Sequence, residues 1–275
     1  MQEVYSSSPD SRQCPTWRLI PPLTASGQMQ MAIDRWLLEK HRQGEHPPTL
    51  RFYTWHPAAI SLGYHQQNYP SAWQEILWQG KPLDIVRRPT GGRAVLHQGD
   101  LTYAVVTSIN PGKRREVYKQ ICQFLITGWR SLGLDLVYGK DNREYAHDHN
   151  CFATATEADL ITITGDKVIG SAQLRRGKAI LQHGSMMLTT DRNLFAQIFN
   201  QPTGNNIYNA IAQDRNSPSE IVSNNNSENT SSNHPSIEKI VTTLSQGAVN
   251  CFKIDLATQP LADAEWQDIV TNFLC

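Results

Sequence analysis

The sequence is poor in the features that mark several protein classes. It has five cysteines in 275 residues, without Cys-x-x-Cys spacing, which argues against a disulfide scaffold or a structural zinc site. Its 25 basic and 25 acidic residues give a formal net charge of zero. Bulk charge therefore gives no reason to expect a nucleic-acid partner.

Long apolar runs are also missing. No stretch approaches the roughly 20 apolar residues needed to cross a membrane. Residues 1–15 are polar and Ser-rich and lack the apolar core of a signal peptide, so we expect a disordered N-terminal tail. Together these absences predict a cytoplasmic protein without a membrane partner, whose residues 16–275 form one domain.

What the chain does contain is a succession of short strand-like and helical segments. Apolar residues recur at helical spacing in four places, and strand-like runs are separated by turn residues. Gly165-Asp166 predicts a tight hairpin turn, Gly177-Lys178 a second turn, and Pro21-Pro22 a connector after a first short strand. Helices are expected around 29–37, 117–129, 237–244 and 266–273, and strands around 17–20, 50–55, 60–62, 85–86, 94–96, 102–107, 159–164, 167–173, 179–183 and 185–188. This order predicts an α+β fold with a mixed, largely antiparallel sheet flanked by helices.

One segment has a different composition from the rest. Between residues 216 and 236, 13 of 21 residues are Asn or Ser, and none is aromatic, Lys or Arg. Such a segment cannot bury enough apolar surface to offset the entropy of ordering. We therefore predict a flexible insertion at about 216–236 within the single domain.

The segment from Arg87 to His97 is the first candidate for chemistry. Gly91 and Gly92 permit a close backbone approach to a ligand, and Arg88 and Arg93, with Arg87, could hold a phosphate or carboxylate. The same string also fits a plain hairpin with surface arginines. His97, which ends the next strand, fits either a satisfied core residue or the rim of a pocket.

Cys151 is the second candidate. It could be a nucleophile if nearby cations lower its pKa, or an inert buried thiol. His147, His149 and Cys151, with His183, also have ligand types and spacing that suit a metal.

The hairpin lysine, Lys167, is the third candidate. Its ordinary role would be a solvated turn residue, but the small side chains of Gly170, Ser171 and Ala172 behind it leave room for a narrow ligand chain. A lysine at the mouth of such a slot could polarise a thioester or adenylate carbonyl. Gln182 and His183 are expected to border the same slot.

Taken together, these segments resemble the biotin/lipoate protein ligase family, with its class II synthetase-like α+β catalytic domain. The likeness runs from about Trp17 to the C-terminus, apart from the Asn/Ser segment. Within the family the sequence is most similar to the octanoyltransferases of the LipM type, which carry Gly-Gly-Arg and a Cys-Phe pair where this chain has Gly91-Gly92-Arg93 and Cys151-Phe152. The approach to the cysteine, His147 to Asn150, departs from the proline and small residue usual there. The resemblance rests on these segments: 27–34, 50–57, 61–64, 87–97, 151–152, 167–173 and 181–185.

The resemblance implies a reaction without ATP or any other cofactor. Cys151 would take octanoyl from octanoyl-acyl carrier protein as a thioester, and the lysine of a lipoyl domain would then attack it. The lipoyl domain would belong to a 2-oxoacid dehydrogenase or to a glycine cleavage H-type protein. Lys167 would orient the acyl carbonyl, while the substrate-binding residues would be Arg88, Gly91, Gly92, Arg93, His97, Gly170, Ser171, Ala172, Gln182 and His183.

Two other functions fit the same sequence. One is an ATP-dependent lipoate-protein ligase that proceeds through an acyl-adenylate. The other is a non-catalytic member that binds an acylated carrier or a cofactor, because a fold alone does not fix an activity.

Overall fold

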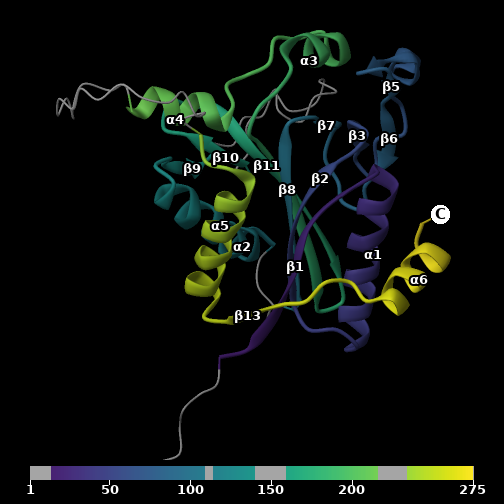
Figure 1. The fold of residues 1–275 in the computed structure, drawn as a ribbon, viewed down its shortest axis with the longest axis vertical. Helices are drawn as coiled ribbons and strands as arrows, with labels where there is room; N and C mark the ends of the chain where they lie inside the picture. Colours follow the sequence, from purple (N-terminus) through teal and green to yellow (C-terminus); the bar gives the residue numbers. More distant parts are fainter. Residues whose placement is uncertain (1–13, 109–113, 140–158, 216–233, 275) are drawn as a thin grey trace, which may run out of the picture.

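A mixed eight-stranded sheet forms the centre of the molecule (Figure 1). The computed structural model describes residues 14–108, 114–139, 159–215 and 234–274. Strand order across the sheet is β13-β1-β2-β8-β12-β11-β10-β9. The strands are β1 (Thr16–Ala25), β2 (Thr49–Trp55), β8 (Asp100–Ser108), β9 (Leu136–Tyr138), β10 (Asp159–Thr162), β11 (Lys167–Arg176), β12 (Ala179–Met187) and β13 (Asp255–Thr258).

Pairing in this sheet is mostly antiparallel. β1 runs parallel to β2 and β13, and the other five strand pairs are antiparallel. A second, three-stranded sheet and a two-stranded ribbon carry the remaining strands: β3 (Ala59–Leu62), β6 (Asp84–Arg87), β7 (Val95–His97), β4 (Leu77–Trp78) and β5 (Lys81–Pro82). The predicted α+β class with a mixed, largely antiparallel sheet is confirmed.

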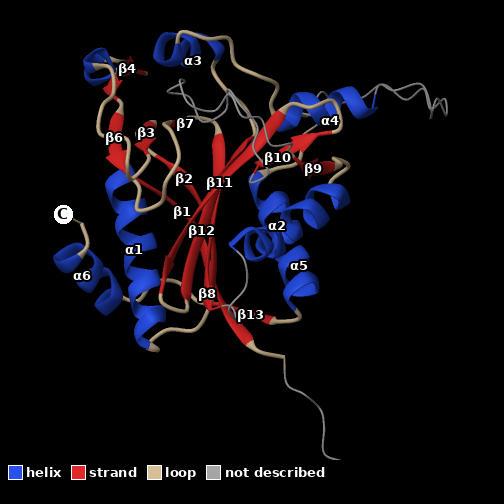
Figure 2. Ribbon diagram, turned by 180° about the vertical axis from the view of Figure 1, so that it is seen from behind, coloured by secondary structure: helices blue, strands red, loops and turns tan. Residues whose placement is uncertain are grey.

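Helices cover both faces of the large sheet (Figure 2). Successive side chains of β8 point to opposite faces, as the pleat requires. Leu101, Tyr103 and Val105 pack in the cluster of α2 (Arg114–Ser131) and α5 (Ile237–Phe252), whereas Ala104 and Val106 pack with α1 (Gly27–Gln43). The rest of the helical structure is η1 (Ser71–Glu75), α3 (Arg192–Phe199), α4 (Ile207–Arg215) and α6 (Asp263–Asn272).

The helix boundaries follow local capping chemistry. Ser26 accepts a hydrogen bond from the backbone N–H of Met29 at the start of α1, and Gly44 ends that helix in the left-handed conformation. Ser236 caps α5 in the same way through Lys239 N–H.

Two strand predictions were wrong in extent. β1 does not stop before Pro21-Pro22 but continues to Ala25, because a register shift between Ile20 and Leu23 removes the prolines from regular pairing with β2. β12 is one unbroken strand through Gly184, not two pieces.

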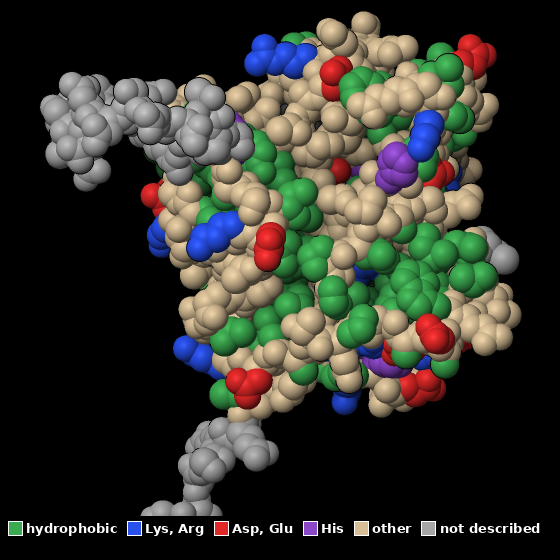
Figure 3. All heavy atoms as spheres, viewed as in Figure 1, with side chains coloured by type: hydrophobic (Ala, Val, Ile, Leu, Met, Phe, Trp, Pro, Cys, Tyr) green, Lys and Arg blue, Asp and Glu red, His purple; other side chains and the backbone are tan. Residues whose placement is uncertain are grey.

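Charge is dispersed over the face of the molecule drawn in Figure 3. Basic and acidic side chains are scattered there among apolar ones. Among the described residues, no helix is long and apolar enough to cross a membrane.

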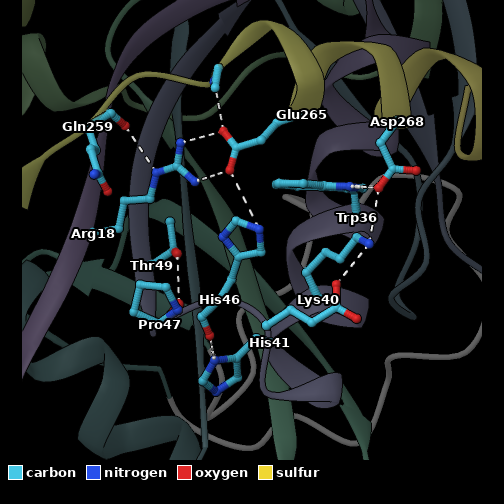
Figure 4. Close-up of polar contacts among 12 residues, drawn as sticks. Arg18, Trp36, Lys40, His41, His46, Pro47, Thr49, Gln259, Glu265 and Asp268 are labelled. Atoms are coloured by element: carbon cyan, nitrogen blue, oxygen red, sulfur yellow. Dashed lines mark hydrogen bonds and ion pairs between the residues drawn. The ribbon is translucent and has the colours of Figure 1, made fainter.

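The C-terminal helix α6 is held by a set of polar contacts with β1 and α1 (Figure 4). The Arg18 guanidinium donates to both carboxylate oxygens of Glu265, at 2.8 and 2.7 Å. The Trp36 indole N–H donates to Asp268 at 2.8 Å, and Lys40 pairs with the same carboxylate at 3.1 Å. We call these four polar contacts the α6 clamp.

Candidate functional site

A pocket of about 620 Å³ is lined by β11 and β12 of the large sheet, by the start of α1 and by the loop that follows β6. Buried polar side chains form much of its wall. They include Ser61, Arg88, Thr90, His97, Thr102, Asp159, His183 and Ser185.

The loop after β6 is fixed by close backbone packing. Gly92 has a φ of +97°, and a Cβ on Gly63 would overlap the Gly92 carbonyl oxygen. The Tyr64 N–H donates to the Thr90 carbonyl at 2.8 Å. Glycine is therefore needed at both places for the loop to close this side of the pocket.

Arg88 stabilises that loop from within. Its guanidinium has five N–H donors, and hydrogen bonds run to the carbonyls of Ser61, Gly91 and Arg93 and to the Ser61 hydroxyl. The side chain is 5% exposed. Arg88 thus holds the loop and also lines the pocket, and its contact with a substrate stays a prediction.

The other two arginines of the motif also point elsewhere. Arg87 is exposed and donates to the carbonyls of Gly63 and Gln66. Arg93 is half-buried and lies outside the residues that line the pocket, whereas Gly91 and Gly92 line it.

His97 is buried in the pocket wall and not exposed at its rim. Its Nδ1 lies 2.9 Å from Asp100 Oδ2, and its Nε2 lies 2.8 Å from the Ser61 hydroxyl. Burial lowers the pKa of His97 despite the opposing effect of Asp100. The imidazole is therefore held in its neutral form near neutral pH.

His183 belongs to a second network of the same kind. Its Nδ1 lies 2.7 Å from Asp34 Oδ2 and its Nε2 lies 2.7 Å from Thr90 Oγ1. Asp34 also accepts from the Tyr53 hydroxyl and pairs with Arg51. Asp34 comes from α1, far away in the sequence, which is why sequence reasoning about His183 did not find it.

Lys167 is buried and ion-paired, not solvated in the turn. Its Nζ lies 2.9 Å from Asp159 Oδ2, and each side chain is 4% exposed. Asp159 lines the pocket, whereas Lys167 is not among the lining residues, so the pair meets the pocket through Asp159. The sequence pointed to the lysine but not to Asp159 as its partner, although both residues belong to the predicted hairpin.

The small residues after Lys167 do line the pocket. Gly170, Ser171 and Ala172 form part of its wall on β11, facing Gly184 on β12. A Cβ on Gly184 would lie 2.5 Å from the Ser171 hydroxyl and 2.6 Å from the Gly170 carbonyl oxygen. A side chain at residue 184 would therefore collide with β11, so this close packing of the two strands requires glycine there.

Gln182 does not share the slot with His183. Its amide donates to Tyr103 Oη at 3.1 Å and to Cys122 Sγ at 3.2 Å, and it is not among the residues that line the pocket. Neighbouring side chains of a strand point to opposite faces, and that of Gln182 points to the side of Tyr103 and Cys122. Burial raises the pKa of the Cys122 thiol to about 12, which makes it an inert core residue.

Cys151, His147 and His149 lie outside the described residues, so the structure neither places the predicted nucleophile nor tests the metal alternative there. Within the residues that are described, no cluster of three or more His, Cys, Asp or Glu is arranged to hold a metal ion.

Proteins of similar sequence show which family the chain belongs to. A family model described as the lipoyl protein ligase A/B catalytic domain matches residues 26–262. "Octanoyltransferase LipM" of Brevibacillus brevis is 34% identical over 260 residues, which cover 90% of this chain and 91% of that protein. The protein of the same name from Anoxybacillus flavithermus is 40% identical over 68% of this chain and 70% of its own.

Solved structures agree on the fold. A lipoate-protein ligase A bound with ATP aligns with a TM-score of 0.69 and 21% identity over 94% of both chains. A bipartite lipoate protein ligase from Thermoplasma acidophilum aligns with a TM-score of 0.65 and 21% identity, covering 95% of this chain and 92% of that one. The match of the family model over most of the chain and the two LipM relatives together place this chain in the lipoyl protein ligase A/B catalytic domain family.

Proposed function

We propose that the chain is an octanoyltransferase that moves octanoyl from an acyl carrier protein to the lysine of a lipoyl domain. The observation that carries this proposal is the buried Lys167–Asp159 pair, whose Asp159 lines the pocket. It occurs in a chain whose relatives at 34–40% identity are named octanoyltransferases.

The chemistry requires two transfers. The Cys151 thiol gives up its proton and its sulfur attacks the donor thioester. A new C–S bond forms, the C–S bond to the carrier breaks, and the carrier sulfur takes up the proton. The neutral amine of the acceptor lysine then attacks the Cys151 thioester, a C–N bond forms, and the cysteine thiol is released. We assign Lys167 to the orientation of the acyl carbonyl, with Asp159 holding its ammonium in place.

The acyl chain would run along the slot between β11 and the loop that follows β6. Gly91, Gly92, Gly170, Ser171 and Ala172 present backbone and small side chains there, so they suit a narrow apolar ligand. Tyr53 and Trp55 add aromatic surface to the same wall.

Charge at the pocket suggests the nature of the donor. Arg114 and Arg176 are exposed residues that line the pocket, at the start of α2 and the end of β11. Exposed cations beside an opening favour the approach of an acidic protein, which suits an acyl carrier protein. We place the acceptor in a 2-oxoacid dehydrogenase or a glycine cleavage H-type protein, and the reaction in the cytoplasm.

An ATP-dependent ligase is the second candidate. It is favoured by the shared fold of the lipoate-protein ligase bound with ATP. That relative is only 21% identical, so the LipM relatives weigh more.

Intact-mass spectrometry would separate the two functions. On mixing with octanoyl-acyl carrier protein and no ATP, we expect an octanoyl adduct that hydroxylamine removes and a lipoyl domain accepts. Cys151→Ala should form no adduct, and Cys14→Ala, which changes an exposed cysteine, should form it normally. Modification that appears only with ATP and free acid would overturn the transferase in favour of the ligase.

A further inference from the structure

Ser61 and His97 in the pocket wall form, with Asp100 behind them, a hydroxyl–imidazole–carboxylate array that the transfer through Cys151 does not use. Ser61 lies on β3, His97 ends β7 and Asp100 begins β8. The Ser61 hydroxyl is 2.8 Å from His97 Nε2, and His97 Nδ1 is 2.9 Å from Asp100 Oδ2. Ser61 and His97 both line the pocket, and the three residues are at most 5% exposed.

The hydrogen bonds fix where the protons are. A carboxylate can only accept, so Nδ1 of His97 carries the proton that faces Asp100. Burial lowers the pKa of His97, which favours the neutral ring. Nε2 is then an acceptor, and the Ser61 hydroxyl must donate to it. A serine proton directed at a neutral histidine that a carboxylate orients is the arrangement that activates a serine nucleophile.

Neighbouring groups orient Asp100 and His97. Asp100 Oδ2 also accepts from the hydroxyls of Thr102 at 3.0 Å and Ser185 at 2.7 Å. The Trp55 ring stacks on His97 with 3.8 Å between centroids. Such contacts keep the imidazole from rotating away from the hydroxyl.

A cation faces the serine oxygen itself. Arg88 Nη1 lies 3.2 Å from Ser61 Oγ, where it stabilises negative charge that develops on that oxygen. The hydroxyl thus gives its proton to His97 and receives a hydrogen bond from Arg88.

The same row of the sheet carries the lysine pair. Across neighbouring strands Asp159 is opposite Gly170, Gly170 is opposite Ser185, and Ser185 is opposite Thr102. Two strand spacings put the Asp159 backbone roughly 10 Å from that of Ser185. The array and the Lys167–Asp159 pair therefore belong to one pocket and can meet the same acyl group.

We propose that Ser61 is a second nucleophile, through which the protein hydrolyses acyl thioesters independently of Cys151. Ser61 Oγ attacks the thioester carbonyl carbon, a C–O bond forms, the C–S bond breaks, and His97 passes the serine proton to the leaving thiolate. Water then attacks the Ser61 ester, with His97 as the base, and releases the free acid and the serine hydroxyl. The proposal rests on the proposed function only for the identity of the acyl group.

Hydrolysis should be slow compared with transfer. All five N–H donors of Arg88 are engaged with chain atoms, which leaves none for the carbonyl oxygen of the substrate. An oxyanion donor is commonly worth about 100-fold in rate or more.

Hydrolysis by the Cys151→Ala protein is the first test. Octanoyl-coenzyme A serves as the thioester, and release of free thiol is followed over time. We expect turnover to persist in Cys151→Ala and to fall about 100-fold when Ser61→Ala or His97→Gln is added. Ser245→Ala, which changes a buried serine on α5 outside the pocket, is the matched control and should change nothing. Equal rates with and without Ser61 would overturn the proposal.

Covalent labelling tests Ser61 without any substitution at Ser61 or His97. Diisopropyl fluorophosphate phosphorylates an activated serine with loss of fluoride, and peptide mapping locates the adduct. In the folded Cys151→Ala protein we expect the label on Ser61. Protein that is denatured in acid before the reagent is added should carry no label on the same peptide. A label on Thr90 instead of Ser61 would contradict the proposal that Ser61 is a nucleophile. The same holds if folded protein takes up no more label than denatured protein. Acylation of Cys151 in the wild type, measured in parallel, shows separately whether the proposed transferase stands.

Discussion

At the scale of single residues, the ion pair between Lys167 and Asp159 joins the chemistry that we propose to the stability of the fold. Two charges with 4% exposure are stable inside the protein only when each has its partner. The same residues that we assign to the acyl carbonyl therefore also support the hairpin of β10 and β11.

Removing one partner should be costly. In Asp159→Asn the buried ammonium loses its countercharge, and we expect the free energy of unfolding in denaturant to fall by about 3–5 kcal/mol. Asp135→Asn is the control, because its ion pair with Arg130 is more than half exposed and is expected to contribute less than about 1 kcal/mol. Equal losses for the two variants would show that burial does not determine the strength of the Lys167 pair.

Residue-scale features were only partly predictable from the sequence. Lys167, His97 and His183 stood out because of their local neighbours. Asp159, the partner of Lys167, is set by sheet register, and Asp34, the partner of His183, lies on helix α1. Neither pairing could be predicted from the spacing of residues in the sequence. Asp100 is the exception, since Gln98-Gly99-Asp100 adjoins His97 and a turn of that length can return a carboxylate to the ring.

At the scale of elements, the C-terminal helix shows how titratable groups attach a surface segment. Hydrogen bonds from Trp36 and Asn272 and the nearby Lys40 lower the pKa of Asp268 from 3.8 to about 2. Burial tends to raise the pKa of Glu265, but Arg18 and the Ala262 N–H outweigh it, and the net shift is downward.

Attachment of α6 should therefore weaken in acid. A carboxyl group whose pKa is lower in the folded state stabilises that state above its unfolded pKa, and the effect is lost as pH falls through the folded pKa. We expect amide hydrogen-exchange protection across α6, corrected for intrinsic rates, to fall between about pH 4 and pH 2.

Helix α5 serves as the internal reference for this measurement, because it lies outside the α6 clamp. In Asp268→Asn the acid-dependent loss across α6 should shrink, since the titrating group is gone. Loss of protection in α5 and α6 together, at the same pH in both proteins, would indicate global acid unfolding and contradict the local account.

Elements with strong periodic patterns were predicted well, and those made by tertiary context were not. Helices α1, α2, α5 and α6 and the β10–β11 hairpin follow from their apolar spacing and turn residues. Helices α3 and α4 have only eight and nine residues, too few for a distinct pattern. Strand β13 has exposed or half-buried side chains and is defined by its pairing with β1.

At the scale of the whole molecule, both helical layers share one sheet. Apolar side chains on alternate positions of β8 and β12 belong to the cluster of α2 and α5 on one face and to that of α1 on the other. A defect in one layer thus reaches strands that also form the pocket wall, so we predict cooperative unfolding as one unit.

Leu244→Ala tests this cooperativity from the face opposite α1. Leu244 on α5 is fully buried, and a Cβ on Gly128 of α2 would lie 2.6 Å from its Cδ2, so truncation leaves a cavity where two helices approach closely. We expect the free energy of unfolding to fall by about 2–5 kcal/mol.

Hydrogen exchange measures whether the two layers open together. The backbone amides of α1 and of β11, beside the pocket, should lose their protection at the same denaturant concentration as those of α5. Val270→Ala, at an exposed position on α6, should change the free energy of unfolding by no more than about 0.5 kcal/mol. Retention of protection in α1 after α5 has opened would instead mean that the two layers unfold separately, and the single domain expected from the sequence would have to be divided.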